Sequence, residues 1–175
     1  TCKPKGVEDL GATDNPAWAF SPLNNFYYIH EAFAPQFDAK GYSENPTRAT
    51  GNDCFTARPA KDDWYETIKL NYGVFYQNGG EQQFDPIPNT WYKMRDILLF
   101  WASKGIDGFR CDMAEMVPQA FWAWAIAQVK EQYPTILFIA EVYNPDLYRS
   151  YIAAGFDYLY DKVGMYDYLR GVTSK

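Results

Sequence analysis

The sequence has 175 residues, a formal net charge of -6 at pH 7 and a 47% share of hydrophobic residues. The length suffices for one sizeable core, and the acidic balance argues against a nucleic-acid partner, whose phosphates require clustered Lys and Arg. No run approaches the roughly 18 apolar residues that a membrane span needs, so we expect no membrane partner.

The chain begins with Thr1 rather than Met, and its start has neither the basic segment nor the apolar segment of a targeting peptide. We therefore expect a processed protein or a piece of a longer one. The compartment stays open, with an extracellular or periplasmic location favoured over a cytoplasmic one.

The part before about residue 88 is punctuated by Pro, Gly, Asn and Asp and shows no sustained periodicity. This pattern predicts turns and short strands, arranged as an irregular excursion. Some of its side chains are of the type that binds calcium, but oxygen-rich loops are common and we do not expect a metal site from them. These side chains are Asp14, Asn15, Asp62 and Asp63.

A regular pattern begins near residue 88. The apolar residues of 89–104 recur at helical spacing, and Gly105 can end this predicted helix. The segment 106–112 then predicts a strand. A second helix is expected over 118–133, where Pro118 suits the first helical position.

The remaining sequence repeats this order. The nearly continuous apolar run 135–143 predicts a strand that is buried on both faces. A helix is expected over 145–154, a strand over 156–161 and a further helix from about residue 165. Helices that alternate with strands imply parallel strands joined by right-handed crossovers, so we predict part of an α/β sheet or barrel.

Two of the predicted strands carry polar side chains where they end. Because strand residues alternate between faces, Arg110 and Asp112 share one face, whereas Phe109 and Cys111 point toward the helices. Glu141 follows the next strand after about 30 residues, the length of one strand-helix-strand unit. Ligands of α/β folds lie beyond these strand ends, so we expect Asp112 and Glu141 to face one another.

Two carboxyl groups at matching heights on neighbouring strands could approach to the ~5–5.5 Å of a retaining glycosidase. Arg110 can keep Asp112 ionised as a nucleophile. Glu141 has no cation nearby in the sequence, so burial should raise its pKa toward general-acid duty. An alternative stays open, because an Arg-x-Asp pair is more often a structural ion pair, and a Glu after a strand often caps a helix or forms a salt bridge.

At these residues the sequence resembles the α-amylase superfamily, glycoside hydrolase family 13. The segment "GFRCD" is similar to the second signature region of the family and "FIAEV" to the third. The resemblance therefore implies that Arg110 is the family arginine, that Asp112 is the catalytic nucleophile and that Glu141 is the acid/base.

The resemblance covers the whole chain, since "IKLNY" (68–72) is similar to the region that leaves domain B of the family. It implies an α/β fold, with a domain B-like excursion over 1–70 and a partial TIM (β/α)8 barrel, about strands 4 to 6, over 71–175. The first signature region would precede this chain, and the fourth, with a third catalytic aspartate, would follow it. We therefore expect a fragment that is inactive by itself.

Three positions depart from the α-amylase pattern. α-Amylases often have Lys-His three and four residues after the nucleophile, where this sequence has Glu115 and Met116. The region leaving domain B often supplies an aspartate to a structural calcium, where this sequence has Lys69. A lysine ammonium could replace the calcium charge, so we assign no cofactor and regard calcium in the intact enzyme as doubtful. These departures argue against a strict starch endo-amylase.

The remaining reactive side chains give little further chemistry. The three cysteines show no Cys-x-x-Cys spacing and, being odd in number, no disulfide framework. A Cys2–Cys54 bridge is one alternative, and Cys111 is expected to be a buried thiol on a strand. The single histidine, His30, excludes a His-rich metal site and weakens any Ser-His-Asp interpretation.

Aromatic residues make up 19% of the sequence, and several lie in or beside the excursion. Sugar rings stack on aromatic faces, so some could form subsites, but the interpretation that most of them fill a small core is favoured. These residues are Trp18, Phe26, Tyr27, Tyr28, Trp64 and Tyr72.

Taken with the resemblance, the residues imply a retaining α-glycoside hydrolase that acts on α-glucan oligosaccharides or polysaccharides by double displacement. A transglycosidase of the same family, such as a branching enzyme, shares both carboxylates and stays open. A non-catalytic carbohydrate-binding homologue also stays open, although such relatives usually lack a catalytic carboxylate. The glucan linkage and the choice between endo and exo action are not determined by the sequence.

Overall fold

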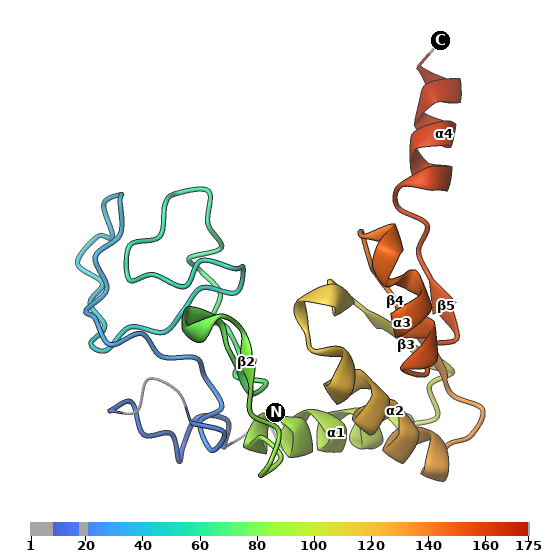
Figure 1. Ribbon diagram of the computed structural model, residues 1–175, viewed down its shortest axis with the longest axis horizontal. Coiled ribbons are helices and arrows are strands. Elements are labelled where there is room, and N and C mark those ends of the chain that lie inside the picture. The colour runs from blue at the N-terminus through green and yellow to red at the C-terminus, as the bar shows by residue number, and fades with distance from the viewer. Residues whose placement is uncertain (1–8, 18–20, 175) are drawn as a thin grey trace. The chain divides into compact units, whose positions relative to one another are not determined.

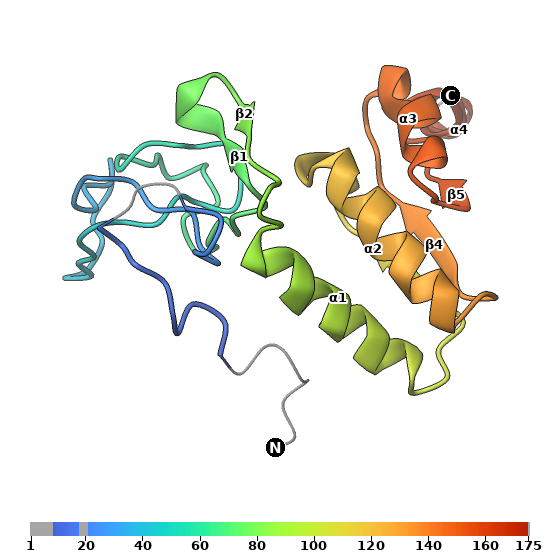
Figure 2. The ribbon, with the colours of Figure 1, turned by 60° about the horizontal axis from the view of Figure 1, so that its bottom comes forward.

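Figures 1 and 2 show the computed structural model, in which residues 9–17 and 21–174 are described. The chain divides into two compact units, residues 1–94 and 95–175, and the division falls within helix α1 (Asn89–Ala102). The predicted boundary at residue 70 concerns the domain organisation of the family and stays a prediction.

Loops make up most of the described part of the first unit, as the density of turn residues predicts (Figure 2). A short antiparallel hairpin pairs β1 (Val74–Phe75) with β2 (Glu81–Gln82), and the single turn η1 (Tyr76–Asn78) connects the two strands. Gly73, just before β1, has φ +86°, and a side chain there would meet the Gln83 carbonyl oxygen at 2.6 Å. Only glycine therefore fits at this position, directly before the first strand of the hairpin.

A small aromatic core holds these loops together. Tyr27 and Tyr28 are buried, so for these two residues the prediction that the aromatic residues fill a core is confirmed. Trp64 is 42% exposed, and Trp18 lies outside the described residues. The cluster contains Tyr27, Ile29, Ala49 and Ala57, and Phe55, Phe75 and Tyr76 pack against it.

Three parallel strands form the sheet of the second unit (Figure 1). They are β3 (Gly108–Cys111), β4 (Leu137–Ala140) and β5 (Tyr158–Leu159), and β4 lies between the other two. The sequence order and the parallel pairing follow the prediction of an α/β sheet. The strands are shorter than the predicted ranges 106–112, 135–143 and 156–161.

Helices connect the strands as the alternating pattern predicts. The segment between β3 and β4 contains the single turn η2 (Ala114–Met116) and helix α2 (Gln119–Gln132), for which Pro118 is the N-cap. Between β4 and β5, the turn η3 (Pro145–Leu147) leads into the short helix α3 (Tyr148–Ala153). Helix α4 (Gly164–Thr173) follows β5.

One face of the sheet packs against α2 and α3. Phe138 of β4 is fully buried, and its ring contacts Phe156, which in turn contacts Trp122 of α2 and Tyr151 of α3. An ion pair adds to this layer: the Nζ atom of Lys130, on α2, lies 2.7 and 2.8 Å from the two carboxylate oxygens of Asp157. The helices therefore cover the face that carries Phe138.

The prediction that the run 135–143 is buried on both faces is wrong for this chain. Phe138 and Ala140 are fully buried, but Leu137, which points to the opposite face, is 39% exposed. In the described part of the chain, the helix layer covers only one face of β4, so the side chains alternate between buried and accessible. A continuous apolar run in the sequence cannot reveal which of its faces is covered.

Cys111 lies on β3 and is buried, as predicted, and its burial raises the pKa of the thiol to about 12. Cys54 also has a free thiol. The alternative of a Cys2–Cys54 bridge involves Cys2, which lies outside the described residues. Among the described residues, none of the helices has the length and apolar character needed to span a bilayer.

Candidate active site

Asp112 and Glu141 end two neighbouring strands at the same height. The parallel register pairs Cys111 with Ala140, and Asp112 and Glu141 are the next residues along the two strands. The ladder extends to this point, because the N–H of Glu141 donates to the Cys111 carbonyl oxygen at 3.0 Å. The predicted placement of both carboxylates at one edge of the sheet is confirmed, and their catalytic roles remain predictions.

A glycine fixes the spacing of these two strands. A Cβ atom on Gly108 would lie 2.7 Å from the carbonyl oxygen of Leu137, closer than such atoms approach in proteins. The absence of a side chain therefore lets β3 and β4 approach one another at the start of the ladder. The same close pairing positions Asp112 beside Glu141 at the other end.

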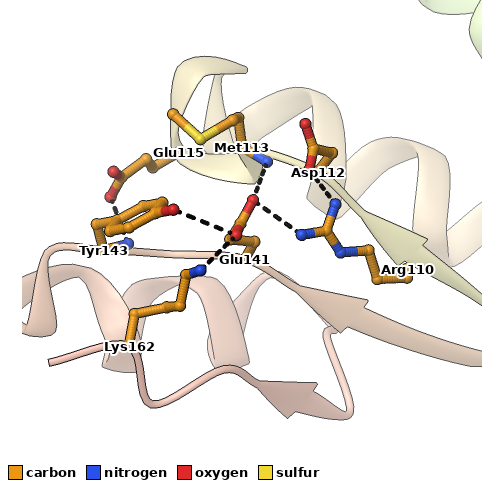
Figure 3. A network of polar contacts seen from close by, with 7 residues as sticks. All are labelled: Arg110, Asp112, Met113, Glu115, Glu141, Tyr143 and Lys162. Carbon is orange, nitrogen blue, oxygen red and sulfur yellow. Dashed lines mark hydrogen bonds and ion pairs between the residues drawn. The ribbon is translucent and has the colours of Figure 1, made fainter. Parts of the chain in front are cut away.

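Arg110 contacts both carboxylates (Figure 3). Its Nη1 atom pairs with Oδ1 of Asp112, and its Nη2 atom lies 3.0 Å from Oε2 of Glu141 on the neighbouring strand. The hydrogen bond to Asp112, followed by one to Tyr160, raises the pKa of Arg110, so the guanidinium stays charged. One fixed cation thus reduces the repulsion between two carboxylates that lie close together.

Exposure differs sharply between the two acids, since the Asp112 side chain is 71% exposed and that of Glu141 is 6% exposed. Burial of a carboxylate requires compensating donors. On Oε2 of Glu141, the donors are Arg110 and the backbone N–H of Met113, the latter at 3.2 Å. The buried acid is therefore held from the β3 side by a side chain and by the main chain.

The other oxygen of Glu141, Oε1, also has two partners (Figure 3). The Nζ atom of Lys162 lies 3.1 Å from it, and the hydroxyl of Tyr143 donates to it at 3.4 Å. Lys162 follows β5 and Tyr143 follows β4, so three strand ends contribute to this site. Every oxygen of the buried carboxylate is therefore bound.

These contacts overturn the prediction that Glu141 has a raised pKa. Burial does favour the neutral form, but the Met113 N–H, Lys162 and Arg110 together outweigh it, and the pKa of Glu141 lies below its ordinary value. The sequence suggested no cation near Glu141 because both cations belong to other strands, one on β3 and one after β5. In this structure Glu141 is a carboxylate at neutral pH.

Met113 has an unusual backbone conformation, with φ 46° and ψ 44° in the left-handed region. For a residue other than glycine this conformation costs roughly 1–2 kcal/mol. The turn that it makes directs the Met113 N–H toward Glu141 and begins η2. The local strain therefore accompanies a contact at the candidate site, a combination that is common at functional positions.

No protein-family model matches the chain. Among solved structures, it is similar to an α-amylase from Lactobacillus plantarum, with 29% identity, a TM-score of 0.42 and coverage of 60% of this chain and 25% of that one. The α-1,4-glucan:maltose-1-phosphate maltosyltransferase of Cereibacter sphaeroides is 33% identical over 136 residues, which are 73% of this chain and 21% of that protein.

The enzyme of the same name from Chlorobaculum tepidum is 36% identical over 164 residues, which are 86% of this chain and 24% of that protein. A match of this extent necessarily includes both strand ends with Asp112 and Glu141. The chain belongs to the α-amylase superfamily. It spans about a fifth to a quarter of the length of these curated relatives.

One departure from the α-amylase pattern now has a structural explanation. Glu115, at a position where α-amylases often have lysine, uses its Oε2 atom to accept hydrogen bonds from the N–H groups of Tyr143 and Asn144, at 3.2 and 3.1 Å. The carboxylate therefore joins the loop after β3 to the loop after β4. It fixes the backbone of the residue whose hydroxyl reaches Glu141.

Sequence reasoning missed Tyr143, Lys162 and the reach of Arg110 to the neighbouring strand. Two signals could have identified the first two residues. Tyr143 lies two positions after Glu141, and Lys162 closely follows a predicted strand. Applying the rule that polar residues gather at the carboxyl ends of parallel strands to all three strands would have placed Lys162 at the same edge.

Two of the four candidate calcium ligands of the excursion, Asp14 and Asp63, have other partners. The two carboxylate oxygens of Asp14 accept hydrogen bonds from the N–H groups of Asn25 and Phe26, at 2.7 and 3.0 Å. Asp63 likewise accepts from Asn52 and from the N–H of Ala60. Within the described residues there is no group of three or more Asp, Glu, His or Cys side chains that could bind a metal ion.

Lys69 occupies the position at which α-amylases often have a calcium ligand. It is buried, and its ammonium lies 5.5 and 5.3 Å from the ring centres of Phe55 and Tyr76 and 3.3 Å from Oδ1 of Asp53. Burial lowers the pKa of Lys69, while Asp53 opposes this shift. A cation that belongs to the chain thus occupies this position, and these residues do not fit a calcium ion.

Proposed function

We propose that this chain is part of a retaining α-glucan-acting enzyme that transfers a glycosyl unit, with Asp112 as the nucleophile and Glu141 as the acid/base. The observation that carries the proposal is the pairing of the two carboxylates at the ends of neighbouring strands, bridged by Arg110. The partial (β/α)8 barrel with a domain B-like excursion belongs to the same proposal. It is supported by the parallel β3-β4-β5 order and by the family membership.

In the first step, a carboxylate oxygen of Asp112 attacks the anomeric carbon of the donor. The bond to the leaving oxygen breaks, and its electron pair goes to that oxygen. When the leaving group is a sugar hydroxyl, Glu141 must supply a proton to it. The exposure of Asp112 supports this assignment, because a nucleophile must be accessible to the substrate.

In the second step, an acceptor hydroxyl gives its proton to the Glu141 carboxylate, and its oxygen attacks the anomeric carbon. The bond between that carbon and Asp112 breaks, which frees the Asp112 carboxylate and retains the configuration of the sugar. Glu141 is then protonated. After transfer from a sugar leaving group this is its starting form, and after transfer from a glycosyl phosphate the proton passes to the released phosphate or to solvent. The lowered pKa of Glu141 supports the base role, because the side chain is already a carboxylate at neutral pH.

The nature of the acceptor decides between transfer and hydrolysis. The names of these two relatives specify transfer from maltose-1-phosphate to an α-1,4-glucan, and this similarity favours a glucan acceptor over water. A glycosyl phosphate also suits a site in which the acid/base is ionised, because phosphate can leave without a full proton transfer. Hydrolysis, the activity expected from the sequence, remains a prediction.

The nucleophile is tested in the full-length protein with a fluorinated glycosyl donor that accumulates the covalent intermediate. We expect the wild type to gain the mass of one glycosyl unit on the peptide that contains Asp112, and Asp112→Asn to gain none. Asp107→Asn is the matched control, because Asp107 precedes β3 at the opposite end of the strand. Labelling of Asp112→Asn equal to that of the wild type would refute the assignment.

The acceptor is tested by product analysis. The wild type is incubated with maltose-1-phosphate and a short α-1,4-glucan, and both phosphate release and glucan length are measured. Transfer predicts one lengthened glucan for each phosphate released. Release of free maltose in place of elongation would establish hydrolysis and exclude the proposed transferase.

A further inference from the structure

The two oxygens of Glu141 are bound by different kinds of partner. Oε2 is contacted by the main-chain N–H of Met113 and by Arg110, which is itself anchored by Asp112. Neither donor can become an acceptor, so a proton on Oε2 would compete with both of these contacts. A proton that Glu141 takes up or gives away is therefore accommodated better on Oε1.

On Oε1 the partners are two side chains that can move. The Tyr143 hydroxyl can rotate to accept a hydrogen bond, whereas the ammonium of Lys162, 3.1 Å away, can only donate. Lys162 thus competes with the proton for the same oxygen. Its side chain is 30% exposed, so it can withdraw into solvent without leaving a buried charge unpaired.

The position of Lys162 depends on the loop after β4. Its Nζ atom lies 4.9 Å from the ring centre of Tyr143, at a distance typical of a cation–π contact. The backbone of Tyr143 is in turn fixed by Glu115. Glu115, Tyr143 and Lys162 therefore form a connected support that reaches Oε1 of Glu141 from the side opposite Arg110 (Figure 3).

We propose that Lys162 is a positioning residue that keeps Oε1 of Glu141 as a carboxylate between turnovers and must move away before this oxygen can carry a proton. The inference rests on the proposed acid/base role of Glu141. It predicts that Lys162 hinders the use of donors whose leaving group needs a proton. Donors with a leaving group that departs unprotonated are not affected in this way.

The ionisable groups around Glu141 come from three strand ends. Arg110 and Lys162 stabilise its charge, and the Tyr143 hydroxyl donates to it. Asp112 pairs with Arg110 and also contacts Glu141 through a side-chain hydrogen bond that lowers the pKa of Glu141, and Glu115 acts through the backbone of Tyr143. Removing Lys162 alone leaves the contacts on Oε2 unchanged, which isolates its contribution.

The test compares the wild type with Lys162→Met and Lys162→Arg in the full-length protein. The pH dependence of kcat/KM is measured with two donors, a maltooligosaccharide and a maltosyl fluoride, because fluoride leaves without a full proton. For Lys162→Met with the maltooligosaccharide, we expect the decline of kcat/KM at basic pH (the basic limb of the profile) to move to higher pH by about one unit or more. Loss of the ion pair with Lys162 should raise the pKa of Glu141.

Lys162→Arg should retain the wild-type profile, and the fluoride donor should show no such movement of the basic limb in any variant. Lys104→Met is the matched control, because Lys104 also lies over an aromatic ring, that of Phe100, and follows α1 rather than a strand end. A merely structural role of Lys162 would lower activity at every pH with both donors and leave the limbs in place. That result would overturn the inference.

The outcome is separable from that of the proposed function. If Glu141 is not the acid/base, Glu141→Gln changes kcat/KM by the same factor with the maltooligosaccharide and with the fluoride, whatever the result for Lys162. If Glu141→Gln loses activity with the maltooligosaccharide but keeps activity with the fluoride, the acid role stands. An unmoved basic limb in Lys162→Met then refutes the role of Lys162 alone.

Discussion

The guanidinium of Arg110 reaches across the sheet to Glu141, with Nη2 3.0 Å from Oε2, while it also pairs with Asp112 on its own strand. A single side chain therefore joins the two acids on which the proposed chemistry depends. Its planar shape allows this double contact, because separate nitrogens serve the two carboxylates.

Arg110→Lys should lower kcat/KM by about 100-fold or more in the full-length protein, since the lysine keeps the charge but cannot hold two carboxylates in fixed geometry. Steady-state kinetics with the maltooligosaccharide measures the effect. Arg149→Lys, an exposed position on α3, is the control and should behave as the wild type. Equal activity of the two variants would show that the double contact is dispensable.

Gly108→Ala should destabilise the protein, because the added Cβ would lie 2.7 Å from the carbonyl oxygen of Leu137 and force β3 and β4 apart. Overpacking of this kind costs roughly 1–3 kcal/mol. The melting temperature measures the loss. Gly171→Ala, in α4, has open space around the new methyl group and should leave stability unchanged or raise it slightly. A melting temperature unaltered by Gly108→Ala contradicts the close approach of the strands.

Glu141→Gln should lose the pH-dependent part of the stability that the carboxylate supplies. Because the folded pKa of Glu141 lies below the ordinary value of 4.5, the ionised side chain stabilises the fold above about pH 4.5, and this contribution disappears as the pH falls through the folded pKa. The difference in unfolding free energy between wild type and variant should therefore shrink on acidification. Denaturant titrations at several pH values measure it.

The control for that series is Glu131→Gln, on the exposed face of α2, which should follow the wild type across the range. A gap that widens as the pH falls would mean that the folded state raises the pKa of Glu141. Such a result would restore the expectation drawn from the apolar run before this residue.

Removal of calcium should leave the melting temperature of the full-length protein unchanged, because Lys69 already places a cation beside Asp53 and near the rings of Phe55 and Tyr76. The measurement compares thermal unfolding in EDTA with unfolding after excess calcium is restored. A clear drop in EDTA, reversed by calcium, would show that another part of the protein binds the ion and that Lys69 does not replace it.

Much of the chain after residue 88 could be predicted from the sequence, because its determinants are local. The spacing of apolar residues in 89–104, Gly105 and Pro118 specify the helices and their ends, and the strand between them follows. The joint placement of Asp112 and Glu141 also needed only the topology, since consecutive parallel strands bring their carboxyl ends to one edge.

The chemistry of Glu141 could not be predicted in the same way. Its ionisation depends on Arg110 and Lys162, which are distant in the sequence, and on the N–H direction at Met113, which follows from a left-handed turn. The prediction that the run 135–143 is buried on both faces failed for a similar reason. The identity of a residue does not specify which neighbours cover it. Both the pKa of Glu141 and the burial of a strand face depend on contacts between residues that are far apart in the sequence.

The shared guanidinium has a consequence for mutagenesis of this site. Loss of the Asp112 charge would leave Arg110 to interact with Glu141 alone, and loss of the Glu141 charge would do the reverse. Substitutions at the two acids therefore do not act independently, and the sum of their separate costs will differ from the cost of the double variant. Neither acid has an intrinsic contribution that a single replacement can isolate.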